Sequence, residues 1–406
     1  MIRHEALLSP APLFDDVLSA PEVATFDESC LDDLFEGALV DPRPYQLRIA
    51  SKAISAFEQH RADPFAELSA SAASVLIESP TGSGKTVMGL GIAQWMQKHY
   101  GLSVGWVAMR RNLLQQAQEE NLRRGFDVKL ELISMFDKNP PKVDMLIVDE
   151  AQHDAASSMA NLHCSVRPQY ILGLTATPFR SDRVKLCFDT VIKDAGIHQL
   201  IQDDYLSRFH HFTIPEYTPE AVAEHYARSP KHWGKSIMFF HRRQQCDAAQ
   251  AALAGYGIRS EVVTATSDRD RQLSDFLSGK VQVLINMCIL TEGFDCPDLQ
   301  TVFCRPSSRA CTIQMCGRVF RKHAAYPFKQ VVQCRNTPHP ILKTASADEQ
   351  YVWNGESWRS LKMNREINKI SSRTRQLIAG AEVKLPKLVA AARTTKPFWQ
   401  QVQERF

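Results

Sequence analysis

The chain has 406 residues, a length typical of two or three domains, and its 44% hydrophobic and 23% charged residues are those of an ordinary globular protein. No run of about 18 apolar residues occurs, and the start of the chain lacks the basic and apolar regions of a secretory signal. These features predict a cytoplasmic protein without a membrane partner. The 10 cysteines form no CxxC pair and no zinc-finger spacing, so we expect reduced thiols in the core.

The formal net charge of +3 is too small to indicate a partner, but the charge is unevenly distributed. Residues 1–41 hold ten acidic residues against one basic residue, and residues 341–406 hold twelve basic residues against six acidic ones. We therefore expect an acidic N-terminal arm over 1–41 and a small basic C-terminal extension over 341–406. Two solvated ends without a special partner would have the same composition.

A first block of alternating strand and helix signals runs from residue 42 to residue 205. Amphipathic stretches such as Thr86–His99 and Asn112–Arg124 predict helices between short apolar runs. The alternating order predicts a parallel sheet with helices on both faces. The apolar runs, rich in Val, Ile and Leu, predict buried parallel strands at Ser74–Ile77, Val104–Ala108, Leu130–Ile133, Met145–Val148 and Tyr170–Leu174.

A second block of the same kind runs from residue 206 to residue 340. Its predicted strands are Ser236–Phe240, Ser260–Val263, Val281–Ile285, Thr301–Cys304 and Gln330–Gln333. Its predicted helices are Arg243–Ala254, Asp268–Leu277 and Ala310–Phe320. The stretch that contains Pro215, Pro219 and Pro230 is interpreted as a linker or peripheral segment between the two sheets.

Beyond Pro340 the pattern changes. Tyr351–Trp358 predicts a hairpin with an Asn-Gly turn, and Asn364–Ala392 predicts helical structure. Trp353 and Trp358 are expected to pack in this hairpin, although tail aromatics, Trp399 included, could also stack on bases.

Ser79–Thr86, with the sequence SPTGSGKT, follows a predicted strand and opens a predicted helix. Gly82 and Gly84 allow backbone N–H groups to turn inward around phosphate oxygens, and the following helix adds the positive end of its dipole. Lys85 is expected to reach the β- and γ-phosphates of a nucleotide, and Thr86 to hold Mg²⁺. Ser79 replaces the first glycine of the usual pattern.

Met145–His153 contains an apolar strand that ends in Asp149 and Glu150. At this distance from a phosphate loop, Asp149 is predicted to bind Mg²⁺ directly or through water. Glu150 is then expected to orient and deprotonate the attacking water.

These two motifs, together with five further segments, resemble the motifs of superfamily 2 helicases in order and spacing over about residues 42–337. The box DEAQH at Asp149–His153 is of the DExH type, and the DEAD-box branch, which has DEAD and SAT, fits less well. GLTATPFR at Gly173–Arg180 and LTEGFDCP at Leu290–Pro297 are similar to the DNA-repair and restriction branch, with RadD, XPB-like proteins and type III restriction motor subunits. The remaining motifs lie at Val107–Gln116, Thr175–Pro178, Ser236–Arg242 and Gln314–Arg321.

The resemblance implies two tandem RecA-like domains, over 42–205 and 206–340, with an ATP cleft between them. Arg318 and Arg321 are implied as arginine fingers on the γ-phosphate, and Gln314 as a sensor of the same phosphate. Asp295 is implied on the ribose, and Gly293 is implied in nucleotide binding. The residues implied in nucleotide binding on the first domain are Arg43, Gln46, Pro80, Thr81, Gly82, Ser83, Gly84, Lys85 and Thr86.

The resemblance also implies residues that connect the nucleotide to a nucleic-acid strand. His153, Thr175 and Thr177 are implied in coupling phosphate state to the strand-binding face. The candidate contacts to nucleic acid, mostly to backbone phosphates, are Arg111, Arg180, His241 and Arg242.

These features predict an ATP-dependent helicase or translocase with Mg²⁺ as cofactor, acting on DNA rather than RNA in repair, recombination or restriction. The alternatives are a motor subunit that serves a nuclease or repair partner without unwinding alone, an RNA helicase, and a nucleotide-dependent clamp with little turnover. The acidic arm is a candidate for autoinhibition of the basic face.

Overall fold

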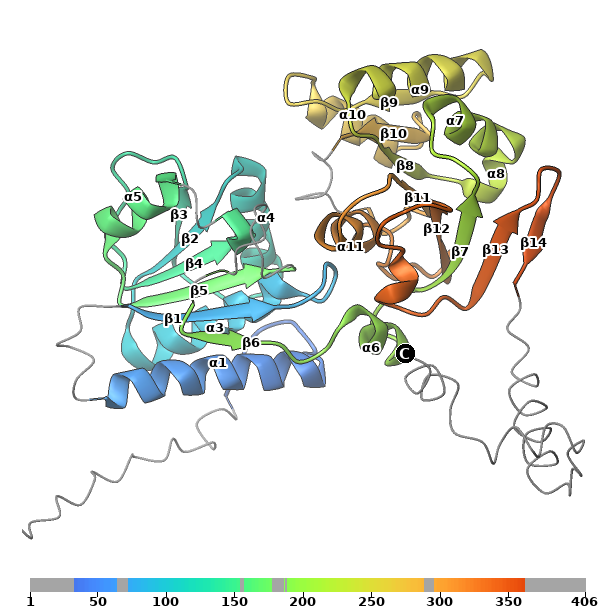
Figure 1. The fold of residues 1–406 in the computed structure, drawn as a ribbon. Helices are drawn as coiled ribbons and strands as arrows, with labels where there is room; N and C mark the ends of the chain where they lie inside the picture. Colours follow the sequence, from blue (N-terminus) through green and yellow to red (C-terminus); the bar gives the residue numbers. More distant parts are fainter. Residues whose placement is uncertain are drawn as a thin grey trace, which may run out of the picture.

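The computed structural model describes residues 33–63, 72–153, 157–176, 186, 188–287 and 296–361. The expected helix over 364–392 and the predicted site residues Thr177, Arg180, Gly293 and Asp295 lie outside these residues, as does the side chain of His153. The chain forms two α/β domains side by side, each with a parallel sheet and covering helices (Figure 1).

The first sheet has six parallel strands in the order β3-β2-β4-β5-β1-β6. Alternate residues of its inner strands point to opposite faces and are buried on both, as in β4, where all residues but the last are buried. Helices α1, α3 and α4 pack on one face and α5 on the other. The elements are α1 (Pro44–Ala62), β1 (Ala73–Glu78), α3 (Lys85–Tyr100), β2 (Val104–Ala108), α4 (Arg111–Arg123), β3 (Leu130–Ser134), β4 (Met145–Asp149), η2 (Ala151–His153), α5 (Ser157–Val166), β5 (Tyr170–Thr175) and β6 (Thr190–Ile192).

The second sheet has eight strands in the order β14-β13-β7-β12-β11-β8-β10-β9, and only the β13–β14 pair is antiparallel. The elements are α6 (Ile197–Gln202) between the sheets, then β7 (Arg208–Ile214), α7 (Pro219–Arg228), α8 (Pro230–Trp233), β8 (Ser236–Phe239), α9 (Arg243–Gly255), β9 (Ser260–Val262), α10 (Arg269–Leu277), β10 (Val283–Asn286), β11 (Thr301–Cys304), α11 (Arg309–Gly317), β12 (Phe328–Cys334), η4 (Ile341–Lys343), β13 (Glu349–Trp353) and β14 (Trp358–Ser360).

All ten predicted strands overlap strands of the structure, and the predicted hairpin is confirmed as β13 and β14. The interpretation of the Pro215–Pro230 stretch as a linker or peripheral segment between the sheets is wrong about its place, because the stretch follows β7 and forms α7 and the start of α8 in the second domain. Pro219 and Pro230 are the first residues of α7 and α8, where a missing N–H leaves no helical hydrogen bond unmade. Instead, the connection between the sheets is the segment of residues 193–207 with α6.

The hairpin belongs to the second sheet, because β13 pairs in parallel with β7, itself paired with β12. Trp358 lies on the aromatic core of this domain, with ring centroids 5.1 Å from Phe212 and 5.7 Å from Trp233. Trp353 packs edge-on against Trp358 at 5.2 Å. The expectation that these two tryptophans pack in the hairpin is therefore confirmed.

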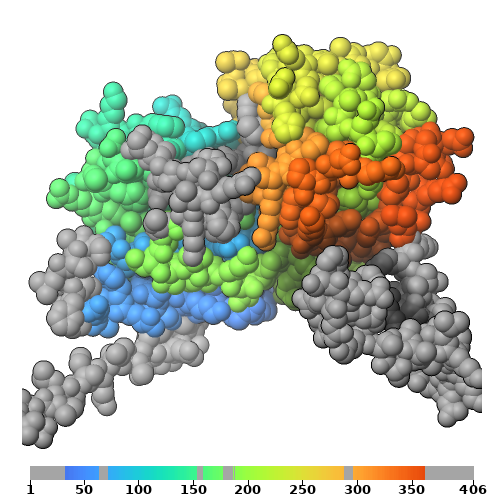
Figure 2. Space-filling view, in the orientation of Figure 1, coloured from blue at the N-terminus to red at the C-terminus, as the bar shows by residue number. Residues whose placement is uncertain are grey.

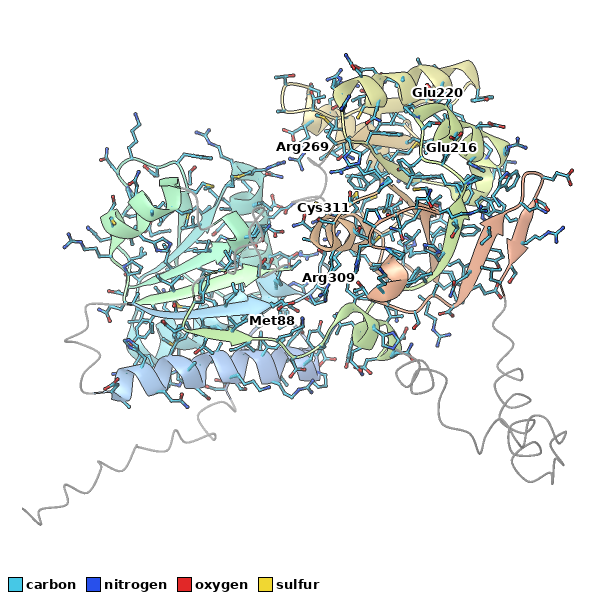
Figure 3. The ribbon with its side chains drawn as sticks, viewed as in Figure 1. Met88, Glu216, Glu220, Arg269, Arg309 and Cys311 are labelled. Carbon is cyan, nitrogen blue, oxygen red and sulfur yellow. The ribbon has the colours of Figure 1, made fainter. Side chains whose placement is uncertain are left out.

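The two domains touch (Figure 2). Helix α11 lies at the side of the second domain that faces the first, with Arg309 and Cys311 at its start (Figure 3). In the described part of the chain, no helix combines the length and hydropathy needed to cross a bilayer.

Candidate nucleotide site

The loop between β1 and α3 has the backbone that its glycines predict. Gly82 and Gly84 both adopt left-handed conformations, with φ of +84° and +83°. Ser79, which replaces the first glycine of the usual motif, is buried and has no left-handed φ. Its amide donates to the Thr175 carbonyl at 2.9 Å and its hydroxyl to Ser83 Oγ at 2.7 Å. A serine is therefore accommodated here, and it fastens the loop to the sheet.

Lys85 is the first residue of α3, and its ammonium lies over the loop. Its Nζ donates to the carbonyls of Ser79 and Pro80, at 3.2 and 3.4 Å. Desolvation lowers the pKa of Lys85. The carboxylates of Glu150 and Asp149 oppose this, and the guanidinium groups of the second domain add to it. The ammonium thus lies in the field of both domains.

Strand β4 delivers Asp149 and Glu150 to the same edge of the sheet. The Glu150 amide donates to Asp149 Oδ1 at 3.0 Å. Glu150 has a φ of +52°, which is unfavourable for a residue with a Cβ and which proteins retain mainly at functional sites.

A hydrogen-bonded chain links Glu150 to the end of β5. Gln152 Nε2 donates to Glu150 Oε2 at 3.0 Å, and the hydroxyl of buried Thr175 donates to Gln152 Oε1 at 2.7 Å. Thr175, predicted as a coupling residue, therefore reaches the carboxylate through Gln152. We did not predict Gln152 from the sequence, because a glutamine between two motif positions has no distinctive spacing.

A cleft of about 510 Å³ brings the two halves of the predicted site together. Arg318 directly follows α11 and is only 4% exposed. Gln314, predicted as a phosphate sensor, lies on α11 but does not line this cleft. The lining from the first domain includes Thr81, Gly82, Gly84, Lys85, Thr86, Asp149 and Glu150, and that from the second is Arg318 and Arg321.

The cleft fits a magnesium ion of the kind that accompanies nucleotides. Thr86, with its hydroxyl, and Asp149, with its carboxylate, are both lining residues of the cleft, as is Lys85. Mg²⁺ is held through one or two carboxylates, with phosphates and water completing the octahedron. No cluster of three or more His, Cys, Asp or Glu side chains occurs among the described residues, so a metal held by protein alone is not indicated there.

The two domains meet where the phosphate loop faces the end of α11. A Cβ added at Gly317 would lie 2.9 Å from the Thr81 Cβ, closer than side chains tolerate. A Cβ at Gly82 would lie 3.1 Å from Leu206 Cδ2. The missing side chain of Gly317 thus allows this close approach, whereas a Cβ at position 82 would require the flexible end of Leu206 to shift by a few tenths of an ångström.

The segment Arg43–Gln46 lies against the phosphate loop at the start of α1. Gln46 is buried, and its Nε2 donates to the Ser83 carbonyl at 2.8 Å. Its Oε1 accepts a hydrogen bond from the Arg43 backbone N–H at 2.9 Å. Both the nitrogen and the oxygen of the Gln46 side chain are therefore hydrogen-bonded to protein atoms. Tyr45, which the sequence did not single out, donates its hydroxyl to the same carbonyl at 2.5 Å. Burial raises the pKa of Tyr45, and the hydrogen bond from Arg43 opposes this.

The predicted nucleic-acid residues that the structure describes lie at the starts of two helices. Arg111 is the exposed first residue of α4, and His241 and Arg242 are exposed directly before α9. Arg305 donates to His241 Nδ1 at 2.8 Å. Partial burial lowers the pKa of His241, and the neighbouring Arg305 lowers it further. Arg305 escaped prediction because it lies 64 residues away in sequence.

Comparison with protein families gives two matches. Residues 39–135 match the family described as type III restriction enzyme, res subunit. Residues 218–323 match the helicase conserved C-terminal domain. The first segment includes the phosphate loop, and the second includes Arg318 and Arg321.

Individual relatives are about a quarter identical to the chain over the residues that align. A 51.5 kDa protein of Lactococcus phage (isolate 7-9) is 25% identical over 267 residues, 57% of this chain and 59% of that protein. The "Putative ATP-dependent helicase IRC3" of Saccharomyces cerevisiae is 26% identical over 229 residues, 46% of this chain and 33% of that protein. The chain thus matches less than two thirds of the length of either relative.

Two solved structures have a similar fold at 15% sequence identity. The ATP-dependent type ISP restriction-modification enzyme LlaBIII, bound to DNA, has a TM-score of 0.52 over 74% of this chain and 28% of that chain. S. cerevisiae Dbp5, bound to RNA and ADP BeF3, has a TM-score of 0.53 over 77% of this chain and 93% of that chain.

The fold and the two family matches identify the class of protein. The chain is a superfamily 2 helicase core built from two tandem RecA-like domains. Within that superfamily, residues 39–135 are similar to the res subunit of type III restriction enzymes, in line with the resemblance in the sequence.

Proposed function

We propose that the chain is an ATP-driven translocase or helicase that acts on nucleic acid, with DNA preferred over RNA. The observation that carries the proposal is the cleft in which Lys85 and Glu150 of one domain face Arg318 and Arg321 of the other. A triphosphate bound between them would contact cations from both sides. Only the closed arrangement offers both sets of contacts, so nucleotide binding would favour closure and hydrolysis would release it.

In this proposal each residue has a separate task. Lys85 and the N–H groups of the loop bind the phosphates, and Glu150, oriented by Gln152, accepts the proton of the attacking water. Arg318 and Arg321 stabilise the charge of the transition state, a contribution of about 10³–10⁵ in rate for an arginine finger. Mg²⁺, held by Thr86 and Asp149, would supply charge neutralisation on the β- and γ-phosphates.

The preference for DNA rests on the branch of the superfamily and is the finer part of the proposal. LlaBIII was solved with DNA, whereas Dbp5 was solved with RNA. Repair, recombination or restriction is proposed as the process. A cytoplasmic location is proposed with it, although one relative, the irc3 helicase of Schizosaccharomyces pombe, is named as mitochondrial.

A panel of ATPase measurements tests the proposal. Single-stranded, double-stranded and forked DNA and single-stranded RNA of equal length are compared as activators at fixed salt. We expect the largest stimulation with DNA, and loss of turnover in Lys85→Ala. ATPase activity that survives Lys85→Ala would contradict the assignment of the site. If RNA stimulates the ATPase and DNA does not, RNA is the substrate instead of DNA.

The second candidate function is a motor that moves on DNA for a nuclease or repair partner without unwinding alone. The similarity to LlaBIII, of which the chain covers 28%, favours this candidate. A strand-displacement assay and a translocation assay on the same protein separate the two. Unwinding by the isolated chain would eliminate the second candidate, and translocation without unwinding would support it.

A further inference from the structure

The short segment of residues 204–207 lies between α6 and β7 (Figure 1). Its side chains and backbone contact both domains. We call it the hinge segment. The motifs of the family do not include it, and its sequence gives no signal of function. Its contacts, however, reach the nucleotide-binding half of the first domain and the residues around Arg321 in the second.

On the side of the second domain, the hinge segment is hydrogen-bonded to three consecutive residues beyond the end of α11, which are Phe320, Arg321 and Lys322. The Ser207 amide donates to the Phe320 carbonyl at 2.8 Å, and the Ser207 hydroxyl donates to the Arg321 carbonyl at 3.1 Å. Lys322 Nζ donates to the Asp204 carbonyl at 2.9 Å and to Asp204 Oδ2 at 2.6 Å. The backbone around Arg321 therefore accepts two hydrogen bonds from Ser207, and the Lys322 side chain donates two more to Asp204.

On the side of the first domain, the segment packs on the phosphate loop and on the start of α1. The Tyr205 ring lies edge-on to Tyr45, with centroids 5.3 Å apart, and the Arg43 guanidinium lies 5.0 Å from the Tyr205 centroid. Leu206 Cδ2 approaches Gly82. Because Tyr45 bonds the Ser83 carbonyl, Tyr205 is connected to the phosphate loop through one ring contact and one hydrogen bond.

We propose that the hinge segment couples occupancy of the base side of the nucleotide site to the placement of Arg321, with Tyr205 and Ser207 as positioning residues. This inference rests on the proposed ATPase function. In this proposal the base lies beside Arg43 and Tyr45, at the segment that the resemblance implies in nucleotide binding. It restrains these two side chains, and they restrain the Tyr205 ring. Ser207, two residues further on, then fixes the carbonyl of Arg321. Hydrolysis is fast only when the base has ordered the segment.

The chain offers variants that remove each contact separately. Tyr205→Leu removes the ring contacts, and Tyr205→Phe keeps them. Ser207→Ala removes the hydroxyl but leaves its amide bond to Phe320. Two substitutions of the same type serve as controls outside the cleft. Tyr256→Leu changes a tyrosine that is 56% exposed, and Ser278→Ala removes a hydroxyl that donates to a local carbonyl, that of Asp275, at 3.1 Å.

The experiment measures kcat and KM with nucleic acid present, for ATP and for inorganic tripolyphosphate, which has no base. For Tyr205→Leu we expect the ratio of the two kcat values to fall at least about fivefold, with Tyr205→Phe retaining the wild-type ratio. For Ser207→Ala we expect the kcat for ATP to fall about threefold to tenfold, the loss of one hydrogen bond, at unchanged KM. The two control variants retain the wild-type values.

A double variant tests whether the two residues act through one segment. If they do, Tyr205→Leu combined with Ser207→Ala is no slower than the slower single variant. The hinge proposal would be overturned if the two single reductions in kcat multiply in the double variant. It would also be overturned if Tyr205→Leu has the wild-type ratio of kcat for ATP to kcat for tripolyphosphate. Neither result would affect the proposed function. A wild-type protein without ATPase activity would instead overturn the proposed function. If the melting temperature shows that Tyr205→Leu is unfolded, Ser207→Ala still tests the proposal.

Discussion

Substitution of Gly317 by alanine tests whether close contact between the domains is needed for turnover. Gly317 is the last residue of α11 and directly precedes Arg318. The added Cβ would lie 2.9 Å from the Thr81 Cβ, whereas ordinary contacts begin at 3.4 Å, so α11 or the phosphate loop must shift by about 0.5 Å. A misplacement of about 1 Å costs on the order of 10² in rate, so half of that distance should cost about tenfold.

The same substitution should leave the fold intact or stabilise it. Gly317 is helical and its φ is not left-handed, so alanine fits the backbone and restricts the unfolded chain, a gain of up to about 1 kcal/mol. We therefore expect kcat of the ATPase to fall about tenfold while the melting temperature stays constant or rises. A general loss of stability would predict the opposite change in melting temperature.

Gly255 provides the matched control. It is also the last residue of a helix, α9, and a Cβ added there would meet no atom within 4 Å. Gly255→Ala should therefore leave kcat within twofold of the wild type in the same assay. The reasoning is refuted if Gly317→Ala hydrolyses ATP as fast as the wild type, or if Gly255→Ala slows it equally.

Three further predictions concern the hydrogen-bonded chain through Gln152, the buried Lys329 and the hairpin of β13 and β14. Gln152→Ala should lower kcat about tenfold with KM for ATP unchanged in steady-state kinetics, because Glu150 loses its orienting donor; an altered KM alone would contradict this. Burial lowers the pKa of Lys329 to about 8, so between pH 8 and its ordinary pKa the unfolded chain binds more protons. The free energy of unfolding should therefore rise with pH in that window by up to about 3 kcal/mol relative to Lys329→Met, measured by urea titration; parallel pH profiles would exclude it. Trp358→Ala should cost about 2 kcal/mol of stability, since the ring is partly buried, and leave the affinity for single-stranded DNA unchanged; weaker binding at equal stability would instead favour base stacking.

The buried strands and the phosphate loop were both predicted from short-range sequence patterns, and the structure contains both. The strands were visible because a buried parallel strand is a short apolar run, as in Met145–Val148. The phosphate loop was visible because its glycines and lysine occur within eight residues. Strands β6 and β7 were missed, since β6 has three residues and β7 contains the polar pair His210-His211.

The nucleotide-side roles of Gln314, Gly293 and Asp295, and the nucleic-acid roles of Arg111 and Arg242, stay predictions. Gln46 illustrates what a motif leaves open. The resemblance implied a contact with the nucleotide, and in the structure both the oxygen and the nitrogen of its side-chain amide are hydrogen-bonded to protein atoms.

By itself, the sequence determined the two sheets, the phosphate loop and the carboxylates at the end of Met145–Val148, because each follows from residues adjacent in the chain. Only the tertiary structure decided which distant side chains meet. Ser207 bonds the Arg321 carbonyl across 114 positions, and Thr175 reaches Gln152 across 23. Such contacts depend on how the two domains close and how strands pair across a sheet, and the periodicity of a single segment carries no information about either.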